Sequence, residues 1–318
     1  MLAARETKML SAERMERMID APTNEEAAKI LEECGYGDLS GLSAKDVGAA
    51  LEAHIAALFD EVEGMVPEAQ LVQLFRLKYD YHNAKALIKA QAMGTDCGAI
   101  LSQRGTVPPQ KLHAAFYEED YRDIPPVLAQ AMVDAAAILA RTANPQAADF
   151  ALDRAYFAQM LALCDGLSDG GFAKGYVQLQ IDGANLRAAV RARRMHKDAA
   201  FLKSVLVPGG SIPAEEICQS LAQDEPFAPL FANTALFAAA QAGDESQTGS
   251  LTAFERLCDN TLTAYFAKAK SVVFGEQVVI AYLCALENEI SAARMIVNGL
   301  QAGLPADTIR ARLRDLYQ

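Results

Sequence analysis

The apolar residues of this chain recur with the spacing of amphipathic helices along most of its length. Over residues 67–93, apolar side chains return every three or four positions and form one face of a helix. Similar patterns cover residues 6–33 with a break at 20–23, residues 43–61 and residues 172–196. No segment alternates apolar and polar residues with the period of a strand. The pattern predicts an all-α protein with well over half of its residues in helices.

Small and polar residues indicate where several helices begin and end. Thr23, followed by acidic residues, predicts a helix start, because a hydroxyl caps free backbone N–H groups and acids favour the positive end of the helix dipole. Gly35 predicts a left-handed helix end. From residue 251 onward, two long helical patterns run to the end of the chain and are split near residues 299–305.

One motif occurs three times in the chain, and each copy places a Lys or Arg five positions after an acid. The acids are separated by 102 and then 107 positions, so three periods nearly fill the 318 residues. The first two copies also carry an Asn three positions after the acid, whereas the third has Ala292 there. The residues of the three copies are Asp80, Asn83 and Lys85; Asp182, Asn185 and Arg187; and Glu289 and Arg294.

Each copy is followed by the pattern Pro-x-x-x-Leu/Ile, which starts at Pro108, Pro213 and Pro305. Proline is tolerated at the first position of a helix, so each period predicts a long helix, a loop and a helix that starts with proline. An internal repeat of this length predicts three similar helical lobes, at about residues 1–115, 116–218 and 219–318, related by a pseudo-threefold axis. Such an arrangement is better suited to seating an axial partner than to enclosing a small substrate.

Charge and hydropathy narrow the choice of partners. The net charge of −12 argues against a nucleic-acid surface, which needs clustered Lys and Arg. The most apolar run, residues 278–286, is far shorter than the roughly 18 to 20 residues that span a bilayer, and predicts a buried helix. The N-terminus lacks the apolar centre of a signal peptide, so we expect a cytoplasmic protein.

The chain contains no recognisable catalytic, cofactor-binding or metal-binding motif. Its six Cys residues form no Cys-x-x-Cys pair, and its four His residues are dispersed, which predicts reduced thiols and no metal site. Asp80, Asp182 and Glu289 could hold a metal if they faced one another. Each is followed by a cation, however, which favours a structural interpretation in which the motif residues hydrogen-bond the long helix of each lobe to its neighbour.

Three segments of the chain resemble the C subunit of the V/A-type rotary ATPases, which is equivalent to the d subunit of the eukaryotic vacuolar ATPase. Residues 77–85 are similar to the family's Asp-x-x-Asn helix, and residues 24–36 are similar to its N-terminal helix and closing Tyr. At residues 34–35 the chain has Cys-Gly where the family pattern has Thr and a polar residue. The most specific likeness lies at residues 267–299, where the C-terminal signature of the family is matched by Phe274-Gly275-Glu276, Ala281-Tyr282, Glu287-Asn-Glu289-Ile290 and Arg294-Met-Ile296.

The resemblance covers the whole chain and implies a function. Members of this family have three helical lobes around a funnel and are not catalysts. The resemblance implies a protein that couples the central shaft of the ATP-hydrolysing head to the membrane rotor ring during proton or sodium transport. It also implies a place on the cytoplasmic face of the membrane, held there by other subunits.

Two other classes of protein remain open from the sequence. A helical-repeat adaptor unrelated to an ATPase would have no reason to carry the Phe274-Gly275-Glu276 signature. An all-α enzyme of the terpene-cyclase or ferritin type would need Asp-rich or Glu-x-x-His motifs, which the chain lacks.

Overall fold

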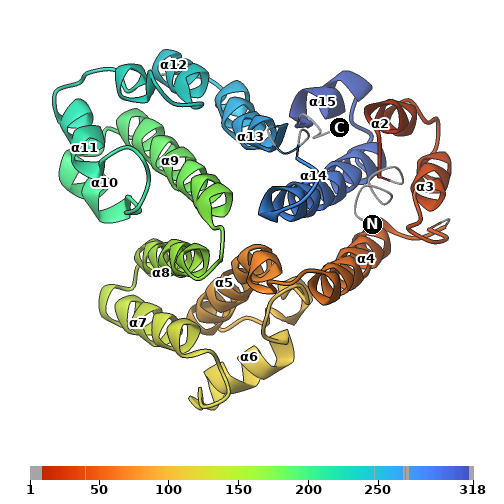
Figure 1. Cartoon of the computed structure of the whole chain (residues 1–318), viewed down its shortest axis with the longest axis horizontal. Helices are drawn as coiled ribbons and strands as arrows, with labels where there is room; N and C mark the ends of the chain where they lie inside the picture. Colours follow the sequence, from red (N-terminus) through yellow and green to blue (C-terminus); the bar gives the residue numbers. More distant parts are fainter. Residues whose placement is uncertain (1–8, 40, 247, 268, 270–271, 315–318) are drawn as a thin grey trace. The chain divides into compact units, whose positions relative to one another are not determined.

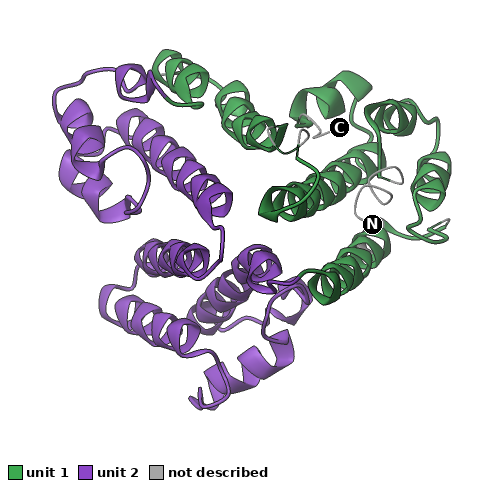
Figure 2. Cartoon of the chain, viewed as in Figure 1, with its two compact units in different colours: residues 1–66, 234–318 green, residues 67–233 purple. Residues whose placement is uncertain are grey.

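All regular secondary structure in the part of the chain that the structure describes is helical (Figure 1). This structure is a computed structural model, and it describes residues 9–39, 41–246, 248–267, 269 and 272–314. None of these residues belongs to a strand, so the predicted all-α class is confirmed. The chain forms two compact units, one built from residues 1–66 and 234–318 and the other from residues 67–233 (Figure 2). The three-lobed funnel and its boundaries stay a prediction.

The unit of residues 67–233 is organised around the long helix α5. Its core combines the C-terminal half of α5 with α6, α7 and α8, and Leu112, Met132 and Leu152 are fully buried there. Two ion pairs also join α5 to α8, with 2.6 Å between Lys85 Nζ and Asp153 Oδ1 and 2.6 Å between Lys89 Nζ and Asp149 Oδ2. The elements of this unit are α5 (Gln70–Met93), η1 (Gly98–Ile100), α6 (Pro109–Tyr117), α7 (Pro126–Thr142), α8 (Pro145–Asp165), α9 (Gly171–Arg194), α10 (Ala199–Val205), α11 (Ala214–Ala222) and η2 (Ala228–Phe231).

The other unit is organised around α14, which α2, α3, α4, α13 and α15 contact. The side chains of Tyr282, Leu283 and Ile296 on α14 are almost completely buried, because neighbours cover this helix on several sides. The elements of this unit are α2 (Ala12–Ile19), α3 (Asn24–Glu33), α4 (Ala44–Met65), α12 (Phe237–Glu245), α13 (Thr252–Phe266), α14 (Glu276–Gln301) and α15 (Ala306–Arg312).

The helix ends follow local polar chemistry. Thr23 caps α3 as predicted, since its hydroxyl accepts a hydrogen bond of 3.2 Å from the N–H of Glu26. The chain leaves α3 through Gly35, whose φ of +93° lies in the left-handed region that favours glycine.

Two predictions about helix ends were wrong. The pattern from residue 251 to about 299 contains two helices rather than one, because α13 ends at Phe266 and α14 begins at Glu276. Pro108, Pro213 and Pro305 lie at the N-cap position, one residue before the first helical residue, and make no side-chain capping hydrogen bond. The first error arose because apolar spacing does not report where a helix ends, and the second is a difference of one position at the helix start.

We expect Gly299→Ala to lower the melting temperature although alanine is the better helix former. A Cβ at Gly299 on α14 would lie 2.8 Å from Cγ1 of Ile309 on α15, so the two helices would have to separate. This overpacking costs about 1–3 kcal/mol and outweighs the gain of about 0.5–1 kcal/mol from replacing a helical glycine.

Gly64→Ala on the exposed side of α4 is the matched control, since no atom lies within 4 Å of its added Cβ. It should raise the melting temperature slightly. Thermal denaturation followed by circular dichroism measures both changes, and an increase for Gly299→Ala would contradict the close packing of α14 on α15.

Candidate functional site

The three copies of the sequence motif lie on three long helices in the same register. Helices α5 and α9 contain 24 residues each and α14 contains 26. Asp80, Asp182 and Glu289 precede the last residue of their helices by 13, 12 and 12 positions. All three carboxyl groups are buried, with at most 3% of each residue exposed. The repeat in the sequence therefore corresponds to a repeated helix with a buried acid near its middle.

On α5, Asp80 and Asn83 hold the loop that follows their own helix. The carboxylate of Asp80 accepts hydrogen bonds from the N–H of Thr106 at 3.1 Å, the N–H of Val107 at 3.0 Å and the Thr106 hydroxyl at 2.6 Å. The Asn83 side-chain amide accepts a hydrogen bond of 2.8 Å from the N–H of Ser102 and donates one of 2.9 Å to the carbonyl oxygen of Ser102. We call this arrangement of an Asp, an Asn and the loop they bind a loop clamp.

The loop clamp is repeated on α9. The carboxylate of Asp182 accepts hydrogen bonds from the N–H of Ser211 at 2.9 Å and the N–H of Ile212 at 3.2 Å, and also from the Ser211 hydroxyl. The Asn185 side-chain amide accepts a hydrogen bond of 2.8 Å from the N–H of Val207 and donates one of 2.8 Å to the carbonyl oxygen of Val207. Each clamp thus satisfies buried backbone groups that have no partner in regular secondary structure.

The loop halves of the two clamps share a sequence signal that was not among the predicted site residues. It reads Gly105-Thr106-Val107-Pro108 in the first copy and Gly210-Ser211-Ile212-Pro213 in the second. A Cβ on Gly105 or Gly210 would lie 2.3 or 2.2 Å from the Asp carboxylate oxygen, so only glycine fits beside the carboxylate. Aligning the two prolines and comparing the three residues before them would have revealed this signal.

The environment of Asp80 shows what the clamp does chemically. Burial raises the pKa of its carboxyl group, while the hydrogen bonds from Thr106 and Val107 and the charge of Arg76 oppose that rise. The hydrogen-bond donors thus compensate for part of the lost hydration of the carboxylate. Asp80 binds backbone, and the motif residues fix a loop instead of joining neighbouring helices through the acid and the Asn.

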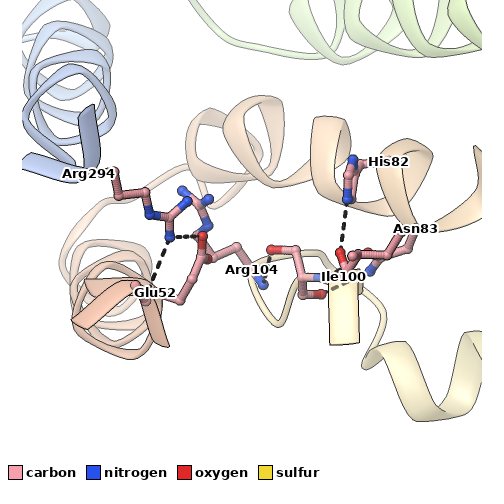
Figure 3. Close-up of polar contacts among 8 residues, drawn as sticks. Glu52, His82, Asn83, Ile100, Arg104 and Arg294 are labelled. Atoms are coloured by element: carbon pink, nitrogen blue, oxygen red, sulfur yellow. Dashed lines mark hydrogen bonds and ion pairs between the residues drawn. The ribbon is translucent and has the colours of Figure 1, made fainter. Parts of the chain in front are cut away.

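The cations of the first and third copies reach neighbouring helices. Lys85 on α5 pairs with Asp153 on α8. Arg294 on α14 pairs with Glu52 on α4 and donates to the carbonyl oxygen of Gly48 at 3.4 Å. Figure 3 shows the Arg294 side chain directed at Glu52, and also shows Asn83 beside the loop that carries Ile100 and Arg104. The cation of the second copy, Arg187, lies half-buried on α9 beside Gly183 of the same helix.

Glu289 in the third copy has a different set of partners. Its Oε1 accepts a hydrogen bond of 2.9 Å from the N–H of Leu10, and its carboxyl group also hydrogen-bonds the Tyr36 hydroxyl. Burial raises the pKa of Glu289 to about 7, although Tyr36, the Leu10 N–H and Arg14 oppose the shift. The third acid therefore binds the N-terminal part of the chain.

The C-terminal signature contains exposed and buried residues side by side. Phe274 is 86% exposed and the adjacent Val273 is 76% exposed, just before α14 begins. Gly275 has a φ of +120°, which favours glycine, and it leads into the buried Glu276. Tyr282 is buried farther along α14. The Lys268, Lys270 and Ser271 positions of the signature lie outside the described residues.

The three acids do not form a metal site in the described structure. Among the residues that it describes, no group of three or more His, Cys, Asp or Glu side chains is placed to hold a metal ion. Within the same residues, no helix has the length and apolar character needed to cross a membrane.

Comparison with known proteins gives the family. The model of the ATP synthase (C/AC39) subunit family matches residues 1–312. The chain belongs to this family. The resemblance to the C subunit of the V/A-type ATPases that the sequence indicated is thereby confirmed.

Curated relatives agree with the family match. The C subunit of the V-type sodium ATPase of Enterococcus hirae is 23% identical over 321 residues, which cover 100% of this chain and 97% of the relative. The C subunit of the A-type ATP synthase of Thermococcus onnurineus is 22% identical over 99% of this chain and 88% of the relative. The C subunit of the V-type ATP synthase of Thermus thermophilus is 29% identical over 55% of this chain and 57% of the relative.

We expect Asn83→Leu and Asn185→Leu each to destabilise the protein. Each change removes two hydrogen bonds and leaves a loop N–H and carbonyl group without partners, at a cost of about 1–3 kcal/mol for each buried group that stays unsatisfied. Chemical denaturation measures the loss in the free energy of unfolding.

Asn298→Leu is the matched control, because Asn298 lies on the exposed side of α14. It should change the free energy of unfolding by less than about 0.5 kcal/mol. Equal effects at all three positions would contradict the loop clamps.

Proposed function

We propose that this member of a V/A-type ATPase is the non-catalytic coupling piece of the central stalk. In this role it binds the central-shaft subunits of the ATP-hydrolysing head on one face and the membrane rotor ring on the other. It works on the cytoplasmic face of the membrane, where the other subunits hold it. The observation that carries the proposal is the family match over residues 1–312, together with relatives that are named as C subunits and match over nearly their whole length.

The contacts within the chain support a part that transmits torque. Such a part has to resist shear, and closely packed helices do so because their interiors deform little. The loop clamps add rigidity at the loops, which are normally the most mobile parts of a helical protein. Buried hydrogen bonds tie each of these loops to the middle of a long helix.

The exposed apolar pair Val273 and Phe274 supports binding to another subunit. Large apolar side chains that stand out from a charged surface are typical of protein interfaces. Gly275 directs the chain into α14 immediately afterwards, so the pair is attached to the central helix of its unit. We propose that this pair contacts a neighbouring subunit of the complex.

The coupling role can be tested on the purified ATPase after removal of this subunit and reconstitution in vesicles. Without the subunit, the head should still hydrolyse ATP, whereas ATP-driven ion transport should stop. Adding the wild-type chain should restore transport. Transport that continues at the normal rate without the chain would rule out the coupling role.

We expect the double change Val273→Ser and Phe274→Ser to weaken assembly without lowering the melting temperature. Loss of an aromatic anchor at an interface costs about 2 kcal/mol or more, which is roughly a 30-fold loss in affinity. Binding of the labelled variant to complex that lacks this subunit measures the effect.

Val127→Ser with Val133→Ser is the control pair, since these α7 side chains are 52% and 45% exposed. The control should bind as the wild type does. Normal binding by the Val273 and Phe274 variant would show that the pair is not an interface, and would leave the coupling role to be judged by the transport experiment.

A further inference from the structure

The third copy of the repeat lacks the loop that the first two copies clamp. Residues 94–108 separate α5 from α6, and residues 195–213 separate α9 from α11. Only residues 302–305 separate α14 from α15. A buried acid is nevertheless kept in register on α14, where it needs hydrogen-bond donors because burial of an unpaired carboxylate is costly.

The donors for Glu289 come from the opposite end of the chain. Leu10 directly precedes Ser11, which caps α2, and its N–H donates to Glu289 Oε1 across 279 positions of sequence. The N–H of Leu10 thus takes the role that the N–H of Val107 has at Asp80 and the N–H of Ile212 has at Asp182. Leu10 is 1% exposed, so the residue that donates the hydrogen bond is buried.

A second contact also joins the ends of the chain, but it is solvent-exposed. Arg310 on α15 pairs with Glu16 at 2.8 Å and Asp20 at 2.6 Å on α2. The two acidic side chains are 54% and 63% exposed, and exposed ion pairs contribute little to stability. The buried Glu289 contact is therefore the stronger of the two links.

We propose that Glu289 is a latch for the N-terminal segment, in which the backbone of Leu10 replaces the missing loop of the third repeat and fastens α2 to α14. The proposal concerns contacts within one compact unit and does not depend on the coupling function. It predicts that α2 detaches locally when the latch is broken, while the rest of that unit stays folded.

The surroundings of the latch allow it to exchange protons with solvent. A cavity of about 200 Å³, large enough for water, adjoins it and is lined in part by Met9, His54 and Glu289. Other titratable or charged groups around Glu289 lie on α2, α3, α4 and α14 and in the segment that follows α3. They are Arg14, Glu33, Cys34, Tyr36, His54 and Tyr282. Burial raises the pKa of Cys34 and Tyr36 above the ordinary values of these residue types and lowers the pKa of His54 below the ordinary value of a histidine. All three side chains therefore favour the neutral form.

The sign of the pH effect follows from the raised pKa of Glu289. The folded protein binds a proton at Glu289 up to about pH 7, whereas the ordinary pKa of a Glu is 4.5. The folded state therefore holds more protons than the unfolded state between these values, so its stability falls as the pH rises through this window. A neutral Glu289 still accepts the hydrogen bond from Leu10.

Hydrogen exchange of the full chain tests the latch. At pH 6, Glu289→Ala should speed exchange of the Leu10 amide and of α2 by about tenfold or more, because a buried N–H loses its acceptor. Glu289→Gln keeps an acceptor and should preserve protection. Arg310→Ala is the control for the exposed link and should change exchange little. Unchanged protection of Leu10 in the Ala variant, or an equal rise throughout α4 and α14, would overturn the latch.

A backbone variant keeps the test decisive if Glu289→Ala fails to fold. Leu10→Pro removes the donated N–H but retains more apolar volume than Leu10→Ala. The latch predicts faster exchange of α2 in the proline variant than in the alanine variant, and the reverse order would overturn it.

Thermal denaturation across the pH range adds an independent measurement. The difference between the melting temperature of Glu289→Gln and that of the wild type should grow as the pH rises from 5 to 8. The wild type loses stability over this range because Glu289 becomes charged, whereas Gln never acquires the buried charge. A difference that does not change with pH would contradict the raised pKa of Glu289.

Discussion

The architecture of this protein depends on a buried carboxyl group that accepts hydrogen bonds from backbone N–H groups outside its own helix. Helices satisfy their own backbone, but the segments between them do not, and a compact helical protein has to bury some of those segments. Asp80 and Asp182 solve this problem for the loops that follow α5 and α9. Each acid accepts two backbone N–H groups and a hydroxyl, and a neighbouring Asn pairs with a third residue of the same loop.

This arrangement links the repeat in the sequence to the physical needs of the fold. The acid has to be buried at a fixed distance from the helix end, and a glycine has to sit beside it because a Cβ would collide with the carboxylate. The Asn has to lie one turn further along the helix. These requirements explain why the motif persists in two copies, and why it changes in the third, where the connection after α14 is too short to be clamped.

The sequence predicted the helical class, most helix positions and the residues of the repeated motif, because these depend on apolar spacing and on fixed intervals along the chain. It predicted that the motif residues bind the neighbouring helix, whereas the acids bind backbone outside regular helices. The partners of Asp80 lie 26 and 27 positions away and Leu10, one partner of Glu289, lies 279 positions away, and no periodic pattern reports such contacts. The break between α13 and α14 was missed for a related reason: Val272, Val273 and Phe274 look like core residues in the sequence, yet Val273 and Phe274 are among its most exposed apolar side chains.

The two loop clamps also differ in a way that matters for protein engineering. The spacing inside the two clamps is the same. The residue bound by the Asn precedes the hydroxyl residue bound by the Asp by four positions, from Ser102 to Thr106 in the first clamp and from Val207 to Ser211 in the second. The interval from the Asn to the residue that it holds is 19 positions in the first copy and 22 in the second, where the segment accommodates α10. The two copies thus differ in length upstream of the clamp and agree inside it. The exposed residues Thr95 and Asp96 are accordingly a suitable place to insert a fluorescent or affinity label, whereas Cys97, which follows them, is buried in the core of this unit.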